Sequence, residues 1–211
     1  GGEVPLRLGG RAFGRAGAWE YGGFLAATDG VAYRDGSGWS EPEAQYSVAR
    51  LRRGLLGNSS IGLLGAAKHG GSADNGVLDV DGALRGPDWQ LAYQVARSWR
   101  ERANGGTAAS AGFKLTRERL TLAAKGRAIG SDFDVDGVGF VPWRGLSDLT
   151  ILGGPRWYFP TGRLSEVEVY AGGNVTHEKV DAYTDRALLV GVSLSARPMA
   201  GGELTLQHGR S

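Results

Sequence analysis

The sequence contains no cysteine, and this absence removes several kinds of site at once. A disulfide framework, a zinc–thiolate centre and a thiol nucleophile all need that residue. The chain also lacks any run approaching the roughly 18–20 apolar residues of a membrane-spanning helix. We therefore expect neither a disulfide-stabilised fold nor cysteine chemistry, and no helical membrane anchor.

An excess of charge of one sign is missing as well. The chain carries 24 basic and 22 acidic residues, and the two signs are interspersed. The most basic spot is Arg50, Arg52 and Arg53, which is typical of one polar face or end of a strand. Because a protein that binds nucleic acid is expected to carry a basic patch or stripe, we predict no nucleic-acid partner.

The first residues contain no secretory signal sequence. Gly1, Gly2 and Glu3 lead directly into strand-like sequence. This beginning resembles the middle of a longer protein, so we expect an N-terminal part to be missing from the chain.

Glycine, in contrast, is abundant, at 37 of 211 residues. This is well over twice its usual share. The glycines follow no collagen-like triplet, and apolar residues are too frequent for a disordered linker. Many turns, or strands whose backbones approach closely, would account for them.

Alternation of apolar and polar residues with a period of two dominates the sequence. Trp89, Leu91, Tyr93 and Val95, for example, occupy every second position of one segment. The alternation predicts about twelve strands, near residues 4–15, 18–28, 43–53, 60–69, 77–85, 88–101, 107–117, 119–130, 147–159, 164–177, 185–197 and 202–208. These strands are roughly 8–14 residues long, whereas strands of soluble sheets typically have about 5–6.

The connections between the expected strands are of two kinds. Tight turns are expected at 86–88, 117–119, 160–163 and 198–201, and longer loops at 29–42, 70–76 and 130–146. Transmembrane β-barrels have short turns at one end and longer loops at the other.

The face opposite the apolar one is repeatedly small or polar. It includes Gln90, Gln94, Lys125, Arg127, Glu166 and Glu168. Such residues would make a poor core for a soluble β-sandwich or lipocalin-like barrel, but a normal hydrated lumen for a membrane barrel. Aromatic residues near the expected strand ends would suit the interfacial girdles of such a barrel. These aromatics are Trp19, Tyr21, Trp89, Trp99, Trp157 and Tyr158.

We therefore predict an all-β fold, namely an antiparallel up-and-down transmembrane β-barrel. Lipid offers no hydrogen bonds, so a sheet in a membrane must close on itself. We expect residues 1–211 to form a single segment of about twelve strands from a larger barrel. A soluble all-β ligand- or carbohydrate-binding module is the alternative that the pattern leaves open.

Three stretches of the chain resemble a known family. Residues 46–53 followed by 59–64 (Tyr-Ser-Val-Ala-Arg-Leu-Arg-Arg, then Ser-Ser-Ile-Gly-Leu-Leu) are similar to a recurrent strand–turn–strand of the domain-of-unknown-function 5916 family. Residues 132–142 resemble that family's Phe-Asn-Pro-Glu-Val-Gly-Phe-Val-Pro-Arg segment, and residues 6–15 its Gly-Gly-x-x-x-x-Gly strand. The family's Asn-Pro pair is Asp134–Val135 here, and Trp143 takes the place of its last Arg.

Members of that family are large outer-membrane-type barrels of Gram-negative bacteria, which often follow a family 9 carbohydrate-binding module. The resemblance implies the bacterial outer membrane as the location and its lipid as a partner. It also implies that a saccharide-binding module, the first barrel segment and the last strands are missing from this chain. The family has no settled activity, so the resemblance implies no mechanism.

One acidic segment matches the first half of a calcium-binding loop. Asp132, Asp134 and Asp136 alternate along it, and Gly137 follows. Calcium requires clustered oxygen ligands, but the twelfth position, which should be a bidentate glutamate, is Trp143. We therefore predict a barrel loop here and no EF-hand, with incidental cation binding as the alternative.

No arrangement of residues points to catalysis. His69, His177 and His208 lie on separate expected strands. Glu166 and Glu168 share a face and could serve as a glycosidase acid–base pair, but lumen lining explains them better. We predict no enzyme activity, no catalytic, metal or cofactor-binding residue and no cofactor. The expected role is in a pore, in transport or in assembly.

Overall fold

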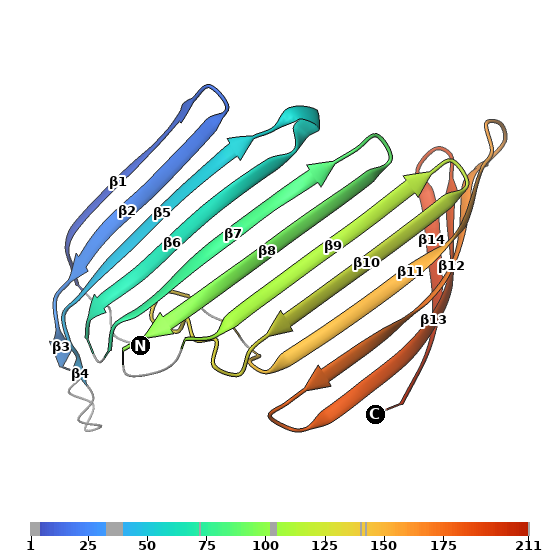
Figure 1. The fold of residues 1–211 in the computed structure, drawn as a ribbon. Coiled ribbons are helices and arrows are strands. Elements are labelled where there is room, and N and C mark those ends of the chain that lie inside the picture. The colour runs from blue at the N-terminus through green and yellow to red at the C-terminus, as the bar shows by residue number, and fades with distance from the viewer. Residues whose placement is uncertain are drawn as a thin grey trace. The chain divides into compact units, whose positions relative to one another are not determined.

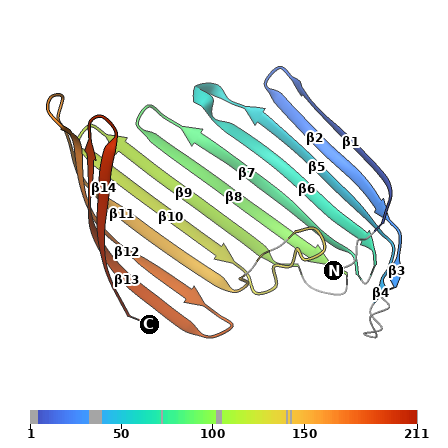
Figure 2. The ribbon, with the colours of Figure 1, turned by 180° about the vertical axis from the view of Figure 1, so that it is seen from behind.

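The computed structural model describes residues 5–32, 40–71, 73–101, 105–139, 141 and 143–210. Twelve strands of 10–15 residues form one antiparallel up-and-down sheet, in which each strand lies beside its neighbours in the sequence (Figure 1). The strands are β1 (Leu6–Ala16), β2 (Trp19–Thr28), β5 (Ala44–Gly54), β6 (Ser60–Gly70), β7 (Asn75–Arg85), β8 (Trp89–Arg100), β9 (Thr107–Arg117), β10 (Leu120–Ile129), β11 (Leu146–Tyr158), β12 (Leu164–Glu178), β13 (Tyr183–Ala196) and β14 (Ala200–Arg210). The same succession is visible from behind (Figure 2).

All twelve strands predicted from the alternation are confirmed, with ends that differ from the expected ones by no more than two residues. The expected loop at 29–42 additionally contains two short strands, β3 (Val31–Ala32) and β4 (Ser40–Glu41), which pair with each other. A single 3₁₀ turn, η1 (Leu56–Asn58), connects β5 to β6. Among the described residues, no helix is long and apolar enough to cross a membrane.

The chain divides into two compact units. Unit 1 comprises residues 1–82, 94–108 and 130–144, and unit 2 comprises residues 83–93, 109–129 and 145–211. The strand order begins at β1 and ends at β14, and each of these pairs with a single neighbour among the described residues. The antiparallel up-and-down sheet is therefore established, whereas its closure into a transmembrane barrel stays a prediction.

One face of unit 1 is apolar. Tyr21 of β2 pairs with Leu51 of β5, which in turn pairs with Leu63 of β6. Leu25 lies on the same face, because an even number of residues separates it from the β2 member of this row. Leu8 lies there too, because its pairing partner on β2 is an even number of residues from Leu25. Leu8 is 72% exposed and Leu25 is 67% exposed.

The opposite face of unit 1 carries charges in pairs. Arg52 Nη1 lies 3.2 Å from Glu20 Oε2, between neighbouring strands. Arg50 Nη2 lies 2.8 Å from Asp81 Oδ2 on β7. Arg53 follows Arg52 in β5 and therefore lies on the apolar face, since successive strand residues point to opposite sides. Its guanidinium is 5.2 Å from the ring of Trp19.

Unit 2 has the same division between its faces. Val190 of β13 pairs with Ala171 of β12 and with Leu206 of β14, and this row is apolar. Ser193, on the other face of β13, pairs with Glu168 and Glu203. Ion pairs line this polar face, among them Arg127–Asp148 at 2.6 Å and Arg156–Glu166 at 2.5 Å.

Among the described residues, no layer of side chains packs over the apolar faces. Leu188 and Leu206 are each 68% exposed. Within the described parts of the chain, the buried apolar side chains are Ala44, Ala66, Ala96, Phe133, Val135 and Leu146. Burying a Leu or Val side chain is worth about 1.5–3 kcal/mol. The rows of exposed Leu and Val therefore leave a large stabilising contribution unused in water.

Some of the abundant glycines lie where strand backbones approach closely, as the composition predicts. A Cβ atom at Gly154 of β11 would lie 1.9 Å from the carbonyl oxygen of Val169 of β12. A Cβ atom at Gly172 of β12 would lie 1.9 Å from the carbonyl oxygen of Ile151 of β11. Neither position can hold a side chain without moving the backbone of its partner strand.

Candidate functional site

A connected group of polar residues in unit 1 surrounds Asp134. The N–H of Asp134 donates to Ser98 Oγ at 2.9 Å, and Asn75 Nδ2 donates to the Asp134 carbonyl oxygen at 2.9 Å. Arg100 and Arg144 contact the Asp134 carboxylate. We refer to these five residues as the Asp134 cluster. It joins the segment 130–144 to the first residue of β7 and the last residues of β8.

The Asp134 carboxylate is held by groups on both sides. Arg100 Nη1 lies 2.8 Å from Oδ2, and Arg144 Nη2 lies 3.1 Å from Oδ1. The N–H of Asp136 donates to Oδ1 at 3.0 Å. Burial by itself would raise the pKa of Asp134, but the Asp136 N–H and the guanidinium groups of Arg144 and Arg100 outweigh it, so this pKa lies below its ordinary value.

Arg144 also contacts a second carboxylate of the segment. Its Nη2 atom lies 2.6 Å from Asp136 Oδ2. The hydrogen bond to Asp136 and the charges of both aspartates raise the pKa of Arg144 above its ordinary value. Arg144 therefore links the two carboxylates and favours a bent course of the chain between them.

Two apolar residues on either side of Asp134 anchor the same segment. Phe133 and Val135 are among the buried apolar residues of unit 1. The N–H groups of Val138 and Gly139 both donate to the Val135 carbonyl oxygen, at 2.8 and 2.6 Å, and so form a tight turn. The segment is thus held by side-chain burial as well as by polar contacts.

The backbone of the segment lies directly against the sheet. A Cβ atom at Gly106, just before β9, would lie 2.1 Å from the backbone nitrogen of Phe133. A Cβ atom at Gly137 would lie 2.8 Å from the Cβ atom of Asn75. Glycine at these two positions lets the segment approach the strands this closely.

The segment covers the charged face of unit 1. Ser98 shares a face of β8 with Gln94, because the two are four residues apart. Gln94 donates a hydrogen bond to Asp79, which shares a face of β7 with Asp81, the partner of Arg50. Residues 130–139 therefore lie over the same face that carries the ion pairs, and not over the apolar one.

The acidic segment that matches half of a calcium loop is tied to arginines. Asp134 and Asp136 both pair with Arg144. The described part of the segment contains turns and no helix, so the predicted loop between strands is confirmed. Across the described chain, no group of three or more His, Asp or Glu side chains could hold a metal ion. Phe140 and Pro142, which belong to the stretch of family resemblance, lie outside the described residues.

The three histidines lie on separate strands, as predicted. His69, near the end of β6, has Nδ1 at 3.3 Å from Asp74 Oδ2, and the Gly70 N–H donates to Asp74 Oδ1 at 2.9 Å. The Gly70 hydrogen bond and the contact with His69 hold the pKa of Asp74 below its ordinary value. His177 on β12 lies 2.9 Å from Thr184 Oγ1, and His208 is on β14.

The glutamates considered for acid–base chemistry lie on the polar face of unit 2. Glu166 is in the ion pair with Arg156 described above. Glu168 lies opposite Ser193, and Tyr170, two residues further along β12, donates a hydrogen bond to Glu203. The shared face that the alternation predicts for Glu166 and Glu168 is confirmed.

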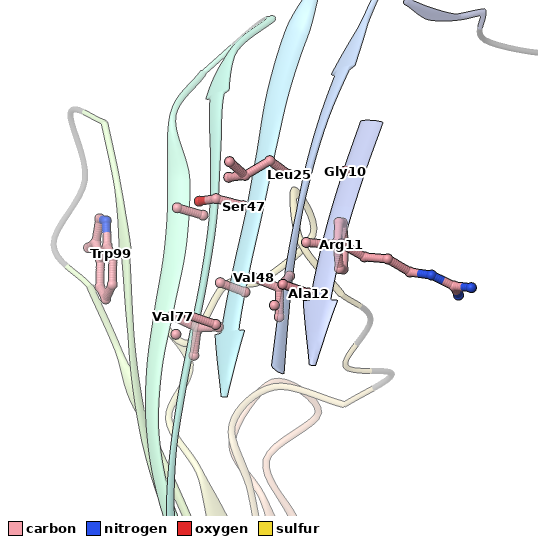
Figure 3. A pocket seen from close by; sticks show the side chains of 14 residues that line it. Gly10, Arg11, Ala12, Leu25, Ser47, Val48, Val77 and Trp99 are labelled. Atoms are coloured by element: carbon pink, nitrogen blue, oxygen red, sulfur yellow. The ribbon is translucent and has the colours of Figure 1, made fainter. Parts of the chain in front are cut away.

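A groove of about 650 Å³ crosses the apolar face of unit 1 (Figure 3). Small residues of four strands line it, including Ala12, Gly23, Ala49 and Gly65, and Trp99 stands at one side. Arg11 lies at its margin and points away from it (Figure 3). The lining can contact an apolar chain, but it offers no acid, base or nucleophile pair.

The Asp134 cluster was not predicted from the sequence, although Asp134 itself was singled out. Its partners Ser98 and Asn75 lie 36 and 59 residues away along the chain. The one sequence signal is the glycine-rich composition, with Gly106 and Gly137 at the points of close approach.

No family model, no curated protein and no solved structure matches this chain. The resemblance to the domain-of-unknown-function 5916 family therefore stays a prediction, and the chain's own geometry carries the functional argument.

Proposed function

We propose that this chain forms the wall of a transmembrane β-barrel in the outer membrane of a Gram-negative bacterium, with a role in a pore, in transport or in assembly. One observation carries the proposal: in both units, rows of exposed large apolar side chains occupy one face while paired charges occupy the other. A barrel wall needs this division, with apolar side chains toward lipid and polar ones toward a hydrated lumen.

Lipid would supply the environment that the apolar faces lack. Leu25 in unit 1 and Leu188 in unit 2 are more than two-thirds exposed. In water each such side chain forgoes about two-thirds of the ~1.5–3 kcal/mol of full burial, whereas acyl chains would cover it without any further protein layer. Strands of 10–15 residues also meet the roughly 9–11 residues that a tilted membrane strand needs.

The positions of the large aromatics further support a membrane setting. Trp19 and Trp89 are the first residues of β2 and β8, and Trp157 is the last but one of β11. Trp157 is 44% exposed. Tyr158, in contrast, pairs with Glu166 and lies on the polar face. Trp and Tyr are favoured at membrane interfaces because their rings are apolar and their N–H or O–H groups reach water.

The edge strands β1 and β14 call for partners in this proposal, because unpaired N–H and C=O groups in lipid each cost several kcal/mol. Further strands of a larger barrel would satisfy them, in line with the family resemblance. The proposal includes no enzymatic reaction. A saccharide ligand would belong to a carbohydrate-binding module outside this chain.

The second candidate is a soluble all-β binding module. The groove beside Trp99 on unit 1 favours it, because an apolar trough next to an exposed indole could hold an apolar ligand or a sugar face. In that case another layer of protein would have to cover the apolar faces.

Cell fractionation of the full-length parent protein, expressed in a Gram-negative host, separates the two candidates. We expect recovery in the outer membrane and a gel mobility that changes on heating, as for a folded, detergent-resistant barrel. Recovery in the soluble fraction without detergent, as a monodisperse species, would refute the barrel wall and support the binding module.

A further inference from the structure

We infer that residues 130–139 form a constriction loop that narrows the passage through the barrel and limits it to small hydrophilic solutes. This inference rests on the proposed function, because only in a barrel is the charged face of unit 1 the wall of a lumen. It goes beyond that function by naming the element that decides what can pass.

The loop folds over the polar face of the sheet. A loop at the end of a barrel can extend into water or turn inward over the lumen face. Residues 130–139 lie over the face that carries Arg50, Asp81 and Gln94, and contact it through Ser98 and Asn75. Within a barrel they would therefore occupy space in the lumen.

The loop is firmly attached to the sheet. Phe133 and Val135 are buried, although the surface beneath them belongs to the polar face of the sheet. Asp134 adds contacts with two guanidinium groups, from Arg100 and Arg144. A loop held by apolar burial, backbone hydrogen bonds and ion pairs together keeps a defined position, which a constriction requires.

The exposed surface of the loop is hydrophilic. Asp132 is exposed, and the side chain of Asp136, whose carboxylate is paired with Arg144, is 62% exposed. Charged and polar side chains favour passage of hydrated solutes, and field lines from such groups concentrate in a narrow channel. The loop is thus suited to select small hydrophilic solutes by size and charge.

A pair of introduced cysteines tests whether the loop is docked in the membrane-inserted protein. The chain has no cysteine of its own, so Asn75→Cys with Gly137→Cys introduces the only thiols. A Cβ atom at position 137 would lie 2.8 Å from Cβ of Asn75, so a shift of the loop backbone by about 1 Å would bring the two Cβ atoms to the ~3.5–4.5 Å of a disulfide. We expect a disulfide to form on mild oxidation. Asn75→Cys with Gly139→Cys is the control, because no atom of residue 75 lies within 4 Å of a Cβ at position 139.

Single-channel conductance in planar bilayers tests the constriction itself. Deletion of residues 131–139 should raise the conductance severalfold. Gly106→Ala should raise it as well, since the added Cβ would lie 2.1 Å from the Phe133 nitrogen and displace the loop. Gly112→Ala on β9 is the matched control, because no atom lies within 4 Å of its added Cβ. We expect this variant to conduct as the unmodified protein does.

The outcomes separate this inference from the proposed function. Protein that inserts and conducts equally with and without residues 131–139 would overturn the constriction loop and leave the barrel intact. Protein that inserts into vesicles but never conducts would overturn it too, as would a double variant Asn75→Cys with Gly137→Cys whose two thiols do not oxidise. A failure to insert would overturn the barrel wall together with the loop.

Discussion

Asp134 is the residue on which three parts of unit 1 converge. Its backbone N–H and C=O groups form hydrogen bonds with the side chains of Ser98 and Asn75. Its carboxylate contacts Arg100 and Arg144. The carboxylate side chain is only 13% exposed. A charge with so little exposure is tolerated because both of its oxygens have cationic or N–H partners. Its protonation state therefore affects how firmly the loop is held.

Replacement of this carboxylate by an amide gives a prediction at the residue scale. Asp134→Asn keeps the side-chain volume but removes the charge that two arginines share. We expect the free energy of unfolding to fall by about 1–2 kcal/mol near neutral pH. This is less than the loss expected for a fully buried hydrogen bond between charged groups, because Arg100 is partly exposed. Urea unfolding of the detergent-solubilised protein measures this change.

The effect of Asp134→Asn should also depend on pH. The pKa of Asp134 is lowered in the folded protein, so its stabilisation is complete above the unfolded-state pKa and is lost as pH falls through the folded-state pKa. The two proteins should then converge in stability in acid. A difference that stays constant down to strongly acidic pH would contradict this. Asp132→Asn, on an exposed residue, is the control and should change stability by less than about 0.5 kcal/mol.

At the scale of the element, β13 displays the division between faces most clearly. Val190 lies in a row with Ala171 and Leu206, whereas Ser193 lies between Glu168 and Glu203. The two positions are three residues apart on one strand, so they share local propensity and strand neighbours. They differ mainly in which face they occupy.

Arginine at each of these positions tests the assignment of the faces. Val190→Arg should block membrane insertion, because arginine on the lipid face costs about 2–4 kcal/mol near the midplane of the bilayer. Ser193→Arg should be tolerated, since the new charge would face Glu168 and Glu203. Insertion into vesicles, followed by protease protection, reports both. Equal tolerance of the two substitutions would count strongly against a lipid-facing Val190.

At the scale of the whole molecule, the two edge strands of the sheet bear on whether the sheet closes into a barrel. Among the described residues, β1 and β14 each pair on one side, and an exposed strand edge is a site for pairing with another strand. In a membrane the outer edge must be paired, whereas in water it can bind solvent. The state of these two edges therefore reports whether the sheet belongs to a closed barrel.

Hydrogen exchange measured on the membrane-inserted parent protein distinguishes these states. If further strands complete the barrel, amides throughout β1 and β14 should be protected as strongly as those of β6 and β12. An open sheet would leave alternate amides of both edge strands exchanging rapidly, because their N–H groups would point away from any partner. Exchange in β6 and β12, which pair on both sides, serves as the internal reference.

The sequence by itself determined the positions of the twelve strands and the faces of their side chains. Alternation such as that of Trp89, Leu91 and Tyr93 is a local property, since a strand exposes successive residues to opposite sides whatever its partners are. Short connections between successive strands then favour antiparallel neighbours, so the strand order followed from the same pattern.

Only the tertiary structure decided where residues 130–139 lie. The acidic spacing of Asp132, Asp134 and Asp136 predicts a loop, but it does not predict that Asp134 is half-buried and contacts Arg100, Ser98 and Asn75. These contacts join residues up to 59 positions apart. They form because pairing of the strands brings the ends of β7 and β8 together, and because Gly106 leaves room for the loop backbone. Such contacts join residues that are far apart in the sequence and meet only in the folded structure, so a local sequence pattern does not reveal them.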